Sequence, residues 1–116
     1  MRFLGLLIGA CLFAACTTTS NADPEAVART RGHEIAQTNC SSCHAIGPSG
    51  DSPFPEAPPF RTLSRNYRVD SLEEALAEGI SVGHPAMPEF QFEPDDVHAL
   101  VSYLQSIQEP TNRAQH

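Results

Sequence analysis

The spacing of apolar positions along the chain predicts helices and gives no signal for strands. The first apolar segment is a continuous run over residues 3–15, interrupted only by glycine. A helical pattern follows over residues 25–37, and Asp23 and Pro24 before it are favoured as a cap and as a first helical residue. The last helical pattern begins at Pro94, and its apolar face consists of Val97, Leu100, Val101, Leu104 and Ile107, joined by Tyr103.

Between these two helices the pattern predicts a proline-rich loop, a short helix and a second loop. Five prolines and two glycines over residues 47–59 exclude a regular helix or a central strand there. A short helix is predicted up to residue 78, because Ser71 and Glu74 have the spacing of a capping box and Gly79 is a typical stop. The second loop, residues 80–90, leads to the last helix. We therefore expect an all-α fold.

The apolar run at the start is typical of an export signal, and its 13 residues are fewer than the about 20 that a membrane-spanning helix needs. Two processing routes stay open. A signal peptidase could cut after the small residues that end segment 1–22, which leaves residues 23–116 as the folded domain. Alternatively, residues 13–16 resemble a bacterial lipobox, in which Cys16 is lipidated and becomes the new N-terminus. Either route predicts a periplasmic protein, soluble or lipid-anchored.

The charge of the chain is acidic, with 14 Asp and Glu residues against seven Arg and no Lys. Removing residues 1–22 removes one arginine, so the remaining domain has six arginines against 14 acids, a formal net charge of −8. Because no basic run exists, binding to nucleic acid or to an anionic membrane surface is excluded as a function class. A protein partner with a basic surface is compatible with this charge, and solubility alone is the other reading.

The predicted domain contains two cysteines, in the sequence Cys-Ser-Ser-Cys-His at residues 40–44. This is the spacing of covalent haem attachment, in which two thiols about one helical turn apart bond the two vinyl groups of one haem c. We predict Cys40 and Cys43 as the attachment sites and His44 as the proximal ligand of the iron. The alternatives are a redox disulfide, half of a zinc site and a structural disulfide, but no βαβ pattern, second cysteine pair or long closed loop supports them.

The second axial position of the iron needs a candidate of its own. Once the signal is removed, Met87 is the one remaining methionine, in a loop stiffened by Pro85 and Pro88. A Met/His pair raises the reduction potential and suits electron transfer, so we predict Met87 as the distal ligand. A gap-filling core methionine is the alternative. His84 is the rival ligand, and the sequence shows no acidic partner for it.

Three arginines and a tyrosine follow the proline-rich loop closely. Haem propionates are carboxylates, which arginine binds bidentately. We predict that one or two members of this group contact a propionate, with solvent exposure as the alternative for each of them: Arg61, Arg65, Tyr67 and the neighbouring Arg68.

The order of these motifs resembles that of class I c-type cytochromes, above all the small single-haem proteins of Gram-negative bacteria, over residues 32–107. The resemblance implies the cytochrome c fold, with three main helices around one covalently bound haem. It implies that Gly32, eight residues before the first haem cysteine, lets the first and last helices cross closely against Tyr103. Four positions before that cysteine the family often has an aromatic residue, where this chain has Ala36. In the family a proline carbonyl also accepts a hydrogen bond from the proximal histidine, and five prolines could supply it.

The resemblance implies a single-electron carrier that is not an enzyme. Its partners would be redox proteins, such as a membrane oxidase, a quinol-oxidising complex or a dehydrogenase. Three alternatives stay open. A five-coordinate haem protein, a gas sensor or weak peroxidase, requires Met87 to be off the iron. The chain could instead be the electron-entry subunit of a dehydrogenase, or a Cys-x-x-Cys redox protein without haem.

Overall fold

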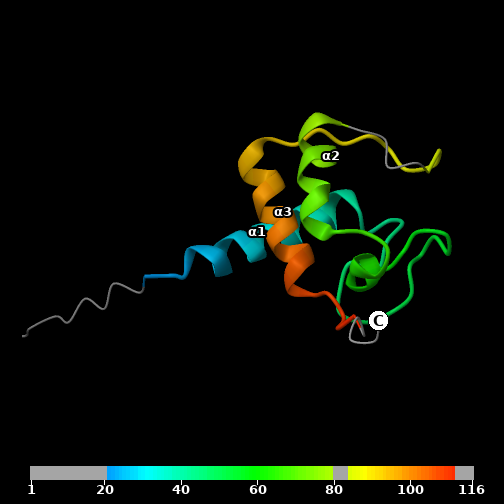
Figure 1. Ribbon diagram of the computed structural model, residues 1–116, viewed down its shortest axis with the longest axis horizontal. Helices are drawn as coiled ribbons and strands as arrows, with labels where there is room; N and C mark the ends of the chain where they lie inside the picture. Colours follow the sequence, from blue (N-terminus) through cyan, green and yellow to red (C-terminus); the bar gives the residue numbers. More distant parts are fainter. Residues whose placement is uncertain (1–20, 80–83, 112–116) are drawn as a thin grey trace, which may run out of the picture.

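The structure is a computed structural model, and it describes residues 21–79 and 84–111. No strand occurs in these residues, so the all-helical prediction is confirmed. None of the helices in the same residues is long and apolar enough to cross a membrane. Most of the predicted signal segment, with Cys16, lies outside the described residues. The helical elements, shown in Figure 1, are α1 (Pro24–Asn39), the 3-10 helices η1 (Phe60–Arg65) and η2 (Val69–Ser71), α2 (Leu72–Glu78) and α3 (Pro94–Ser106).

Local sequence accounts for most of the helix ends. Asp23 Oδ1 accepts a hydrogen bond from the backbone N–H of Glu25 at 3.1 Å, so the predicted cap of α1 is present. After α2, Gly79 adopts φ +70°, the left-handed conformation that glycine takes without strain. The capping-box prediction is wrong, because the Ser71 side chain makes no cap hydrogen bond. Ser71 has helical backbone angles and ends the 3-10 turn η2, whereas a capping residue needs an extended backbone.

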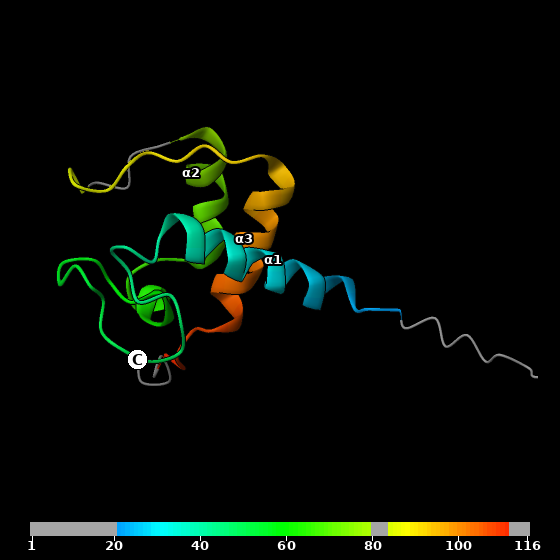
Figure 2. The same cartoon turned by 180° about the vertical axis from the view of Figure 1, so that it is seen from behind.

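Helices α1 and α3 cross in direct contact, as both ribbon views show (Figures 1 and 2). The contact lies at Gly32, where an added Cβ would be 2.6 Å from the carbonyl carbon of Ala99 and 2.7 Å from Cβ of Tyr103. These distances leave no room for a side chain. His33 adds an edge-on ring contact to Tyr103, with 5.2 Å between centroids. The close crossing expected from the family resemblance is therefore present.

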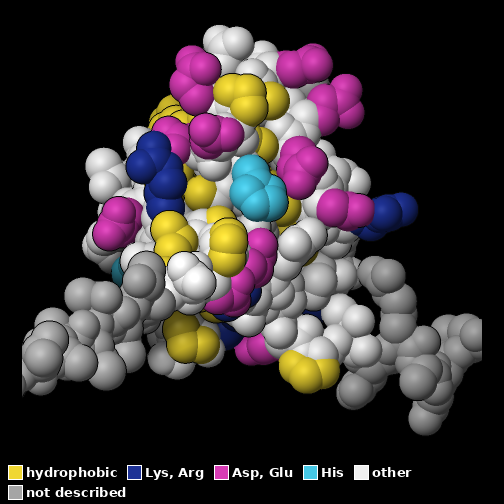
Figure 3. Space-filling view, turned by 90° about the vertical axis from the view of Figure 1, so that its left-hand side faces the viewer, with side chains coloured by type: hydrophobic (Ala, Val, Ile, Leu, Met, Phe, Trp, Pro, Cys, Tyr) yellow, Lys and Arg dark blue, Asp and Glu magenta, His cyan; other side chains and the backbone are white. Residues whose placement is uncertain are grey.

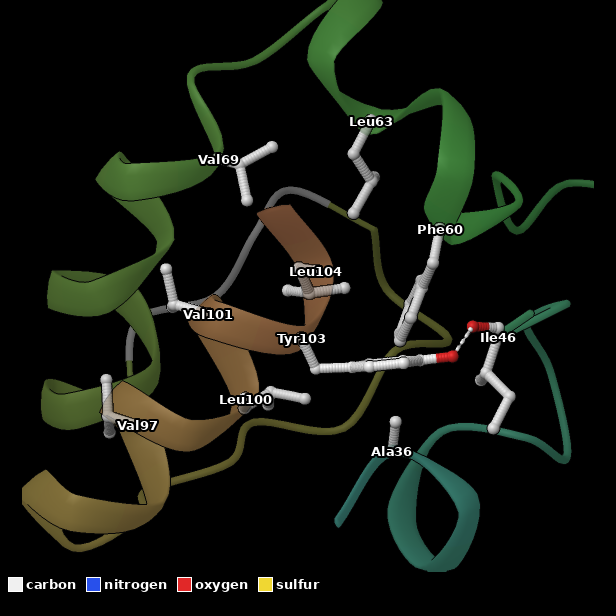
Figure 4. Packing of buried hydrophobic residues seen from close by; sticks show 10 residues of the cluster. All are labelled: Ala36, Ile46, Phe60, Leu63, Val69, Val97, Leu100, Val101, Tyr103 and Leu104. Atoms are coloured by element: carbon white, nitrogen blue, oxygen red, sulfur yellow. Dashed lines mark hydrogen bonds between the residues drawn. The ribbon is translucent and has the colours of Figure 1, made fainter. Parts of the chain in front are cut away.

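The hydrophobic core lies between α3 and the segments that surround it (Figure 4). One polar link joins α3 to the chain just after the Cys-Ser-Ser-Cys-His motif, where the buried Tyr103 hydroxyl donates a hydrogen bond to the carbonyl oxygen of Ile46 at 2.8 Å. The buried residues of the core are Ala36, Ile46, Phe60, Leu63, Val69, Val97, Leu100, Val101, Tyr103 and Leu104.

Two loops extend to the same side of the helix crossing in both ribbon views (Figures 1 and 2). The absence of helix and strand predicted for residues 47–59 is confirmed, and it extends to residues 45 and 46, so the proline-rich loop comprises residues 45–59. Of the predicted second loop, residues 84–90 are described, and the chain continues without helix or strand to residue 93. This loop of residues 84–93 returns to α2 through a hydrogen bond from Phe92 N–H to the carbonyl oxygen of Leu76 at 2.9 Å. The proline-rich loop, which begins directly after His44, and the loop that carries Met87 therefore lie on one side of the molecule.

Candidate functional site

The Cys-Ser-Ser-Cys-His motif forms a tight turn at the C-terminal end of α1. The N–H of Cys40 donates to the carbonyl oxygen of Ala36 at 2.8 Å, and the N–H of His44 donates to that of Cys40 at 2.9 Å. The turn thus continues the helical path through both cysteines. Cys40 and Cys43 are free thiols. Two free thiols one turn apart, followed by a histidine, are the donor set that covalent haem attachment requires.

The Cys40 thiol lies in an apolar environment. Cys40 packs against the hydrophobic core, and this burial raises its pKa to about 11, with the charge of the nearby Cys43 adding to the shift. Burial disfavours the thiolate because a charge is poorly solvated in an apolar environment. The Cys40 sulfur is therefore a neutral thiol at physiological pH.

The His44 ring is held from two sides. Its Nδ1 lies 2.8 Å from the carbonyl oxygen of Pro58, and its ring centroid lies 4.9 Å from that of Phe60. A carbonyl oxygen only accepts hydrogen bonds, so Nδ1 carries the proton and donates it. In a neutral imidazole this leaves the lone pair on Nε2, which is the atom available to a metal. Pro58 is thus the proline that serves the histidine, of the five left open by the sequence.

Hydrogen bonds donated by backbone N–H groups fold the proline-rich loop onto the motif. Phe54 N–H donates to the carbonyl oxygen of Cys43 at 3.1 Å. Ala45 N–H donates to Oγ of Ser52 at 3.0 Å, and Phe60 N–H donates to the carbonyl oxygen of Ala45 at 2.9 Å. The loop therefore runs out from the motif and back to it, which brings the carbonyl that orients the histidine into range.

Met87 lies half-buried in the loop of residues 84–93. Its N–H donates to the carbonyl oxygen of His84 at 3.0 Å, which closes a short turn. Pro85 in this turn and Pro88 after it are exposed. Their fixed φ angles restrict the backbone on both sides of the methionine. Its role as distal ligand stays a prediction.

His84 has an acidic partner, so the expectation that it lacks one is wrong. Its Nε2 lies 3.1 Å from Oε2 of Glu56, and its Nδ1 accepts a hydrogen bond from Ala86 N–H at 3.3 Å. Glu56 is 28 positions earlier in the chain, and only the fold of the proline-rich loop brings it to His84. Both ring nitrogens of His84 are therefore engaged by protein groups.

The arginines predicted to contact propionates are paired with protein carboxylates. Arg61 Nε lies 3.1 Å from Oε1 of Glu109, and a terminal nitrogen of Arg65 lies 2.5 Å from the other oxygen of the same carboxylate. Arg61 also donates to the carbonyl oxygen of Gly50 at 2.7 Å, and its side chain is only 17% exposed. Tyr67 is exposed, and the neighbouring Arg68 pairs with an aspartate two positions on. The propionate contacts stay predictions.

Comparison with known proteins decides the family. Residues 30–108 match the family model described as cytochrome c. The chain belongs to the cytochrome c family. It is similar to cytochrome c-552 of Bradyrhizobium diazoefficiens, with 29% identity over 103 residues that cover 87% of this chain and 94% of that protein.

A second similarity is to the cbb3-type cytochrome c oxidase subunit FixP of a Bradyrhizobium species, with 28% identity over 109 residues. The match covers 81% of this chain but 37% of FixP, so this cytochrome spans little more than a third of that subunit. No solved structure matches the chain.

Membership of the cytochrome c family implies a covalently bound haem c with its iron, and the residues at the end of α1 fit that group. Cys40 and Cys43 are free thiols, and the hydrogen bond from Nδ1 to Pro58 directs the other nitrogen of His44, Nε2, away from that contact, so that in a neutral imidazole its lone pair is available to a metal. These three residues would hold the haem and its iron from the proximal side.

Three contributors to the site were not identified from the sequence. Pro58 is one of five prolines that are equivalent in the sequence, and only its contact with His44 Nδ1 at 2.8 Å distinguishes it. Phe60, which packs on His44, begins the short helix η1, whose six residues show no clear periodicity. Glu56 is one of many exposed acids in the chain, and nothing local distinguishes it.

Proposed function

We propose that this cytochrome is a single-electron carrier with one haem c, attached to Cys40 and Cys43 and ligated by His44 and Met87. The haem would supply a reversible one-electron couple between ferric and ferrous iron. The observation that supports the proposal best is the hydrogen bond from His44 Nδ1 to the Pro58 carbonyl, because it leaves the other ring nitrogen as the one available to a metal.

The protein's contribution is to keep the positions of the iron ligands constant while the charge of the iron changes. Pro58 and Phe60 orient the His44 ring, and the turn between His84 and Met87 restricts the methionine. A site whose ligands stay in place reorganises little when an electron arrives or leaves. This property suits electron transfer.

The peroxidase alternative needs an open iron position and a distal base with a free nitrogen. His84 with Glu56 has the residue types for such a base. Its Nδ1 accepts from Ala86 N–H, however, and its Nε2 faces the Glu56 carboxylate, so neither nitrogen is available to a substrate. This supports a carrier that is not an enzyme.

The charge distribution supports a redox partner with a basic surface. All seven arginines lie outside residues 69–111, a segment with nine acidic residues. Acidic side chains also outnumber basic ones on the face drawn in Figure 3. Six acids of the segment are exposed and form no ion pair with another described residue, namely Glu73, Glu74, Glu78, Glu89, Glu93 and Asp95. The negative electrostatic field of these acidic side chains speeds association with a basic partner, and salt weakens this effect.

The similarity to FixP supports a respiratory partner, and we propose that the electron acceptor is a terminal oxidase of the cbb3 type. Reduced protein should then be oxidised by membranes that contain such an oxidase, at a rate that falls with ionic strength. Co-purification with a dehydrogenase as a stable complex would instead indicate an electron-entry subunit.

We propose that the protein is periplasmic, released in soluble form or anchored through lipid on Cys16. The apolar run that precedes Cys16 supports export. Cys16→Ser separates the two forms, since it should move a lipidated protein from the membrane fraction to the soluble fraction and leave a soluble protein where it is.

A spectroelectrochemical titration of the protein, matured with a cytochrome c assembly system, tests the carrier function. We expect full reversibility with the slope of a one-electron couple, about 59 mV per tenfold change in the ratio of the two forms. The ferrous form should bind carbon monoxide poorly. Ready carbon monoxide binding with peroxide turnover would favour the sensor or peroxidase alternative, and a colourless product would favour a redox protein without haem.

A further inference from the structure

A series of contacts joins the Cys-Ser-Ser-Cys-His motif to the loop of residues 84–93, the Met87 loop, without passing through the helices. Phe54 N–H donates to the carbonyl oxygen of Cys43 at 3.1 Å. The Phe54 ring meets the His84 ring edge-on, with 6.0 Å between centroids and 80° between planes. His84 in turn accepts the backbone hydrogen bond from Met87. The attachment side and the methionine side of the site are thus connected through two aromatic rings.

A second contact joins His84 to the proline-rich loop. The carboxylate of Glu56, two residues after Phe54, lies 3.1 Å from Nε2 of His84. Because Nδ1 accepts from Ala86 N–H, the ring N–H lies at Nε2, and it donates to the carboxylate. The His84 side chain therefore contacts the proline-rich loop twice, through its ring at Phe54 and through Nε2 at Glu56. Its Nδ1 contacts the turn to which His84 itself belongs.

The Met87 loop has few other attachments near the methionine. From residue 84 to residue 91, the only hydrogen bond or ion pair to a described residue outside the loop is that of His84 to Glu56. The next attachment is Phe92 N–H to Leu76, five residues beyond Met87. Without the His84 contact, the turn that carries the methionine would be free to move away from the proline-rich loop.

We propose that His84 is a positioning residue for the distal ligand. Together with Phe54 and Glu56 it forms a clamp that holds the Met87 turn against the proline-rich loop and so keeps the thioether on the iron. The inference rests on the proposed ligation by Met87. His84 acts through that residue and does not bind the iron itself.

Competition between imidazole and Met87 for the ferric iron measures directly how well the clamp holds the thioether on the iron. Imidazole binds only after the thioether has left, so its apparent affinity is proportional to the fraction of molecules with Met87 detached. A partly exposed hydrogen bond and an edge-on ring contact together favour the attached state by about fivefold to tenfold. In His84→Ala holoprotein we therefore expect the apparent Kd for imidazole to fall by about the same factor.

Four further variants make the experiment specific. Glu56→Ala should lower the apparent Kd for imidazole part of the way. Glu56→Gln should keep this Kd close to the wild-type value, because the amide oxygen still accepts from Nε2. Glu56→Ala combined with His84→Ala should add little to His84→Ala alone. Asp51→Ala is the matched control, because it removes an exposed acid from the same proline-rich loop that forms no ion pair with a described residue. We expect Asp51→Ala to bind imidazole as the wild type does.

The possible outcomes distinguish a failure of the proposed clamp from a failure of the proposed ligation by Met87. The clamp lies outside the hydrophobic core, so urea unfolding followed by helical circular dichroism should be unchanged in these variants. If wild-type ferric protein has the iron–thioether absorption band but His84→Ala binds imidazole no more tightly, the clamp is wrong and the carrier function stands. If the wild type lacks that band, ligation by Met87 is wrong and the clamp is rejected with it.

Discussion

His44 Nδ1 and the carbonyl oxygen of Pro58 lie 2.8 Å apart, and this contact joins the end of α1 to the far end of the proline-rich loop. A histidine that donates from one nitrogen becomes a stronger ligand through the other, because the donated proton leaves more electron density on the ring. The proline contributes through its backbone, and its fixed φ angle keeps the carbonyl in place. If His44 binds the iron as proposed, the loop is part of the metal site through this carbonyl.

Loosening this loop should change the reduction potential. Pro58→Gly keeps the carbonyl but frees the backbone, which weakens the hydrogen bond to His44 and so stabilises ferric iron less. We expect the potential to rise by about 20–40 mV, the equivalent of losing part of one hydrogen bond. Potentiometric titration measures it. Pro53→Gly, in an exposed part of the same loop, is the control, and equal shifts in the two variants would contradict a specific role for Pro58.

The helix crossing should not tolerate a methyl group at Gly32. Gly32→Ala would place Cβ against the backbone of Ala99 and Cβ of Tyr103, so the helices must separate. We expect a loss of about 2–3 kcal/mol in the free energy of unfolding. Gly47→Ala is the matched control, because an added Cβ there meets nothing within 4 Å. Urea unfolding of both variants tests the prediction, which fails if they lose the same stability.

The Tyr103 hydroxyl should make stability depend on alkaline pH. Burial raises the pKa of Tyr103, whose ordinary value is about 10. Because the folded-state pKa lies above the unfolded-state pKa, its contribution is fully present below about pH 10 and is lost as pH rises through the folded value. Tyr103→Phe should flatten this loss.

At neutral pH Tyr103→Phe should cost about 1–2 kcal/mol, since the buried carbonyl of Ile46 loses its donor. Urea unfolding at neutral pH and at several pH values above 9 separates the two effects. Tyr67→Phe, which removes an exposed hydroxyl, should change the neutral-pH stability by less than about 0.5 kcal/mol. An unchanged alkaline profile in Tyr103→Phe would contradict the assignment.

Glu109 should anchor the chain after α3 to η1. Glu109→Ala leaves Arg61 without its carboxylate in a site where the guanidinium is mostly shielded from water. We expect a loss of about 1–2 kcal/mol, somewhat smaller at high salt. Asp70→Ala, which releases the exposed Arg68, should have a smaller effect and is the comparison in the same urea experiment. Equal losses in the two variants would show that the shielding of Arg61 is unimportant.

The features that could be predicted from the sequence depend on residues close together in the chain. The motif at residues 40–44 is contiguous, and the apolar face of α3 repeats with helical spacing. The cap at Asp23 and the stop at Gly79 also involve neighbours only. The helix crossing at Gly32 is the exception, because it came from resemblance to a family and not from local pattern.

The features that could not be predicted join residues far apart in the chain. Glu56 and His84 are separated by 28 positions and Arg61 and Glu109 by 48, so no local pattern indicates either pair. Helix η1 escaped detection because a six-residue 3-10 helix is too short to show a periodicity. Ser71 satisfied the capping-box pattern, but a preceding 3-10 turn had already placed it in a helical conformation.

The most direct test of the account is the absorption spectrum of the matured protein, recorded in the ferric and ferrous states and again after denaturation, beside Met87→Ala. We predict that the haem remains attached to the denatured chain of both proteins. The folded ferric wild type should show the weak red band of an iron–thioether bond, and Met87→Ala should lack it. A haem that is released on denaturation, or a matured protein without colour, would contradict the central claim.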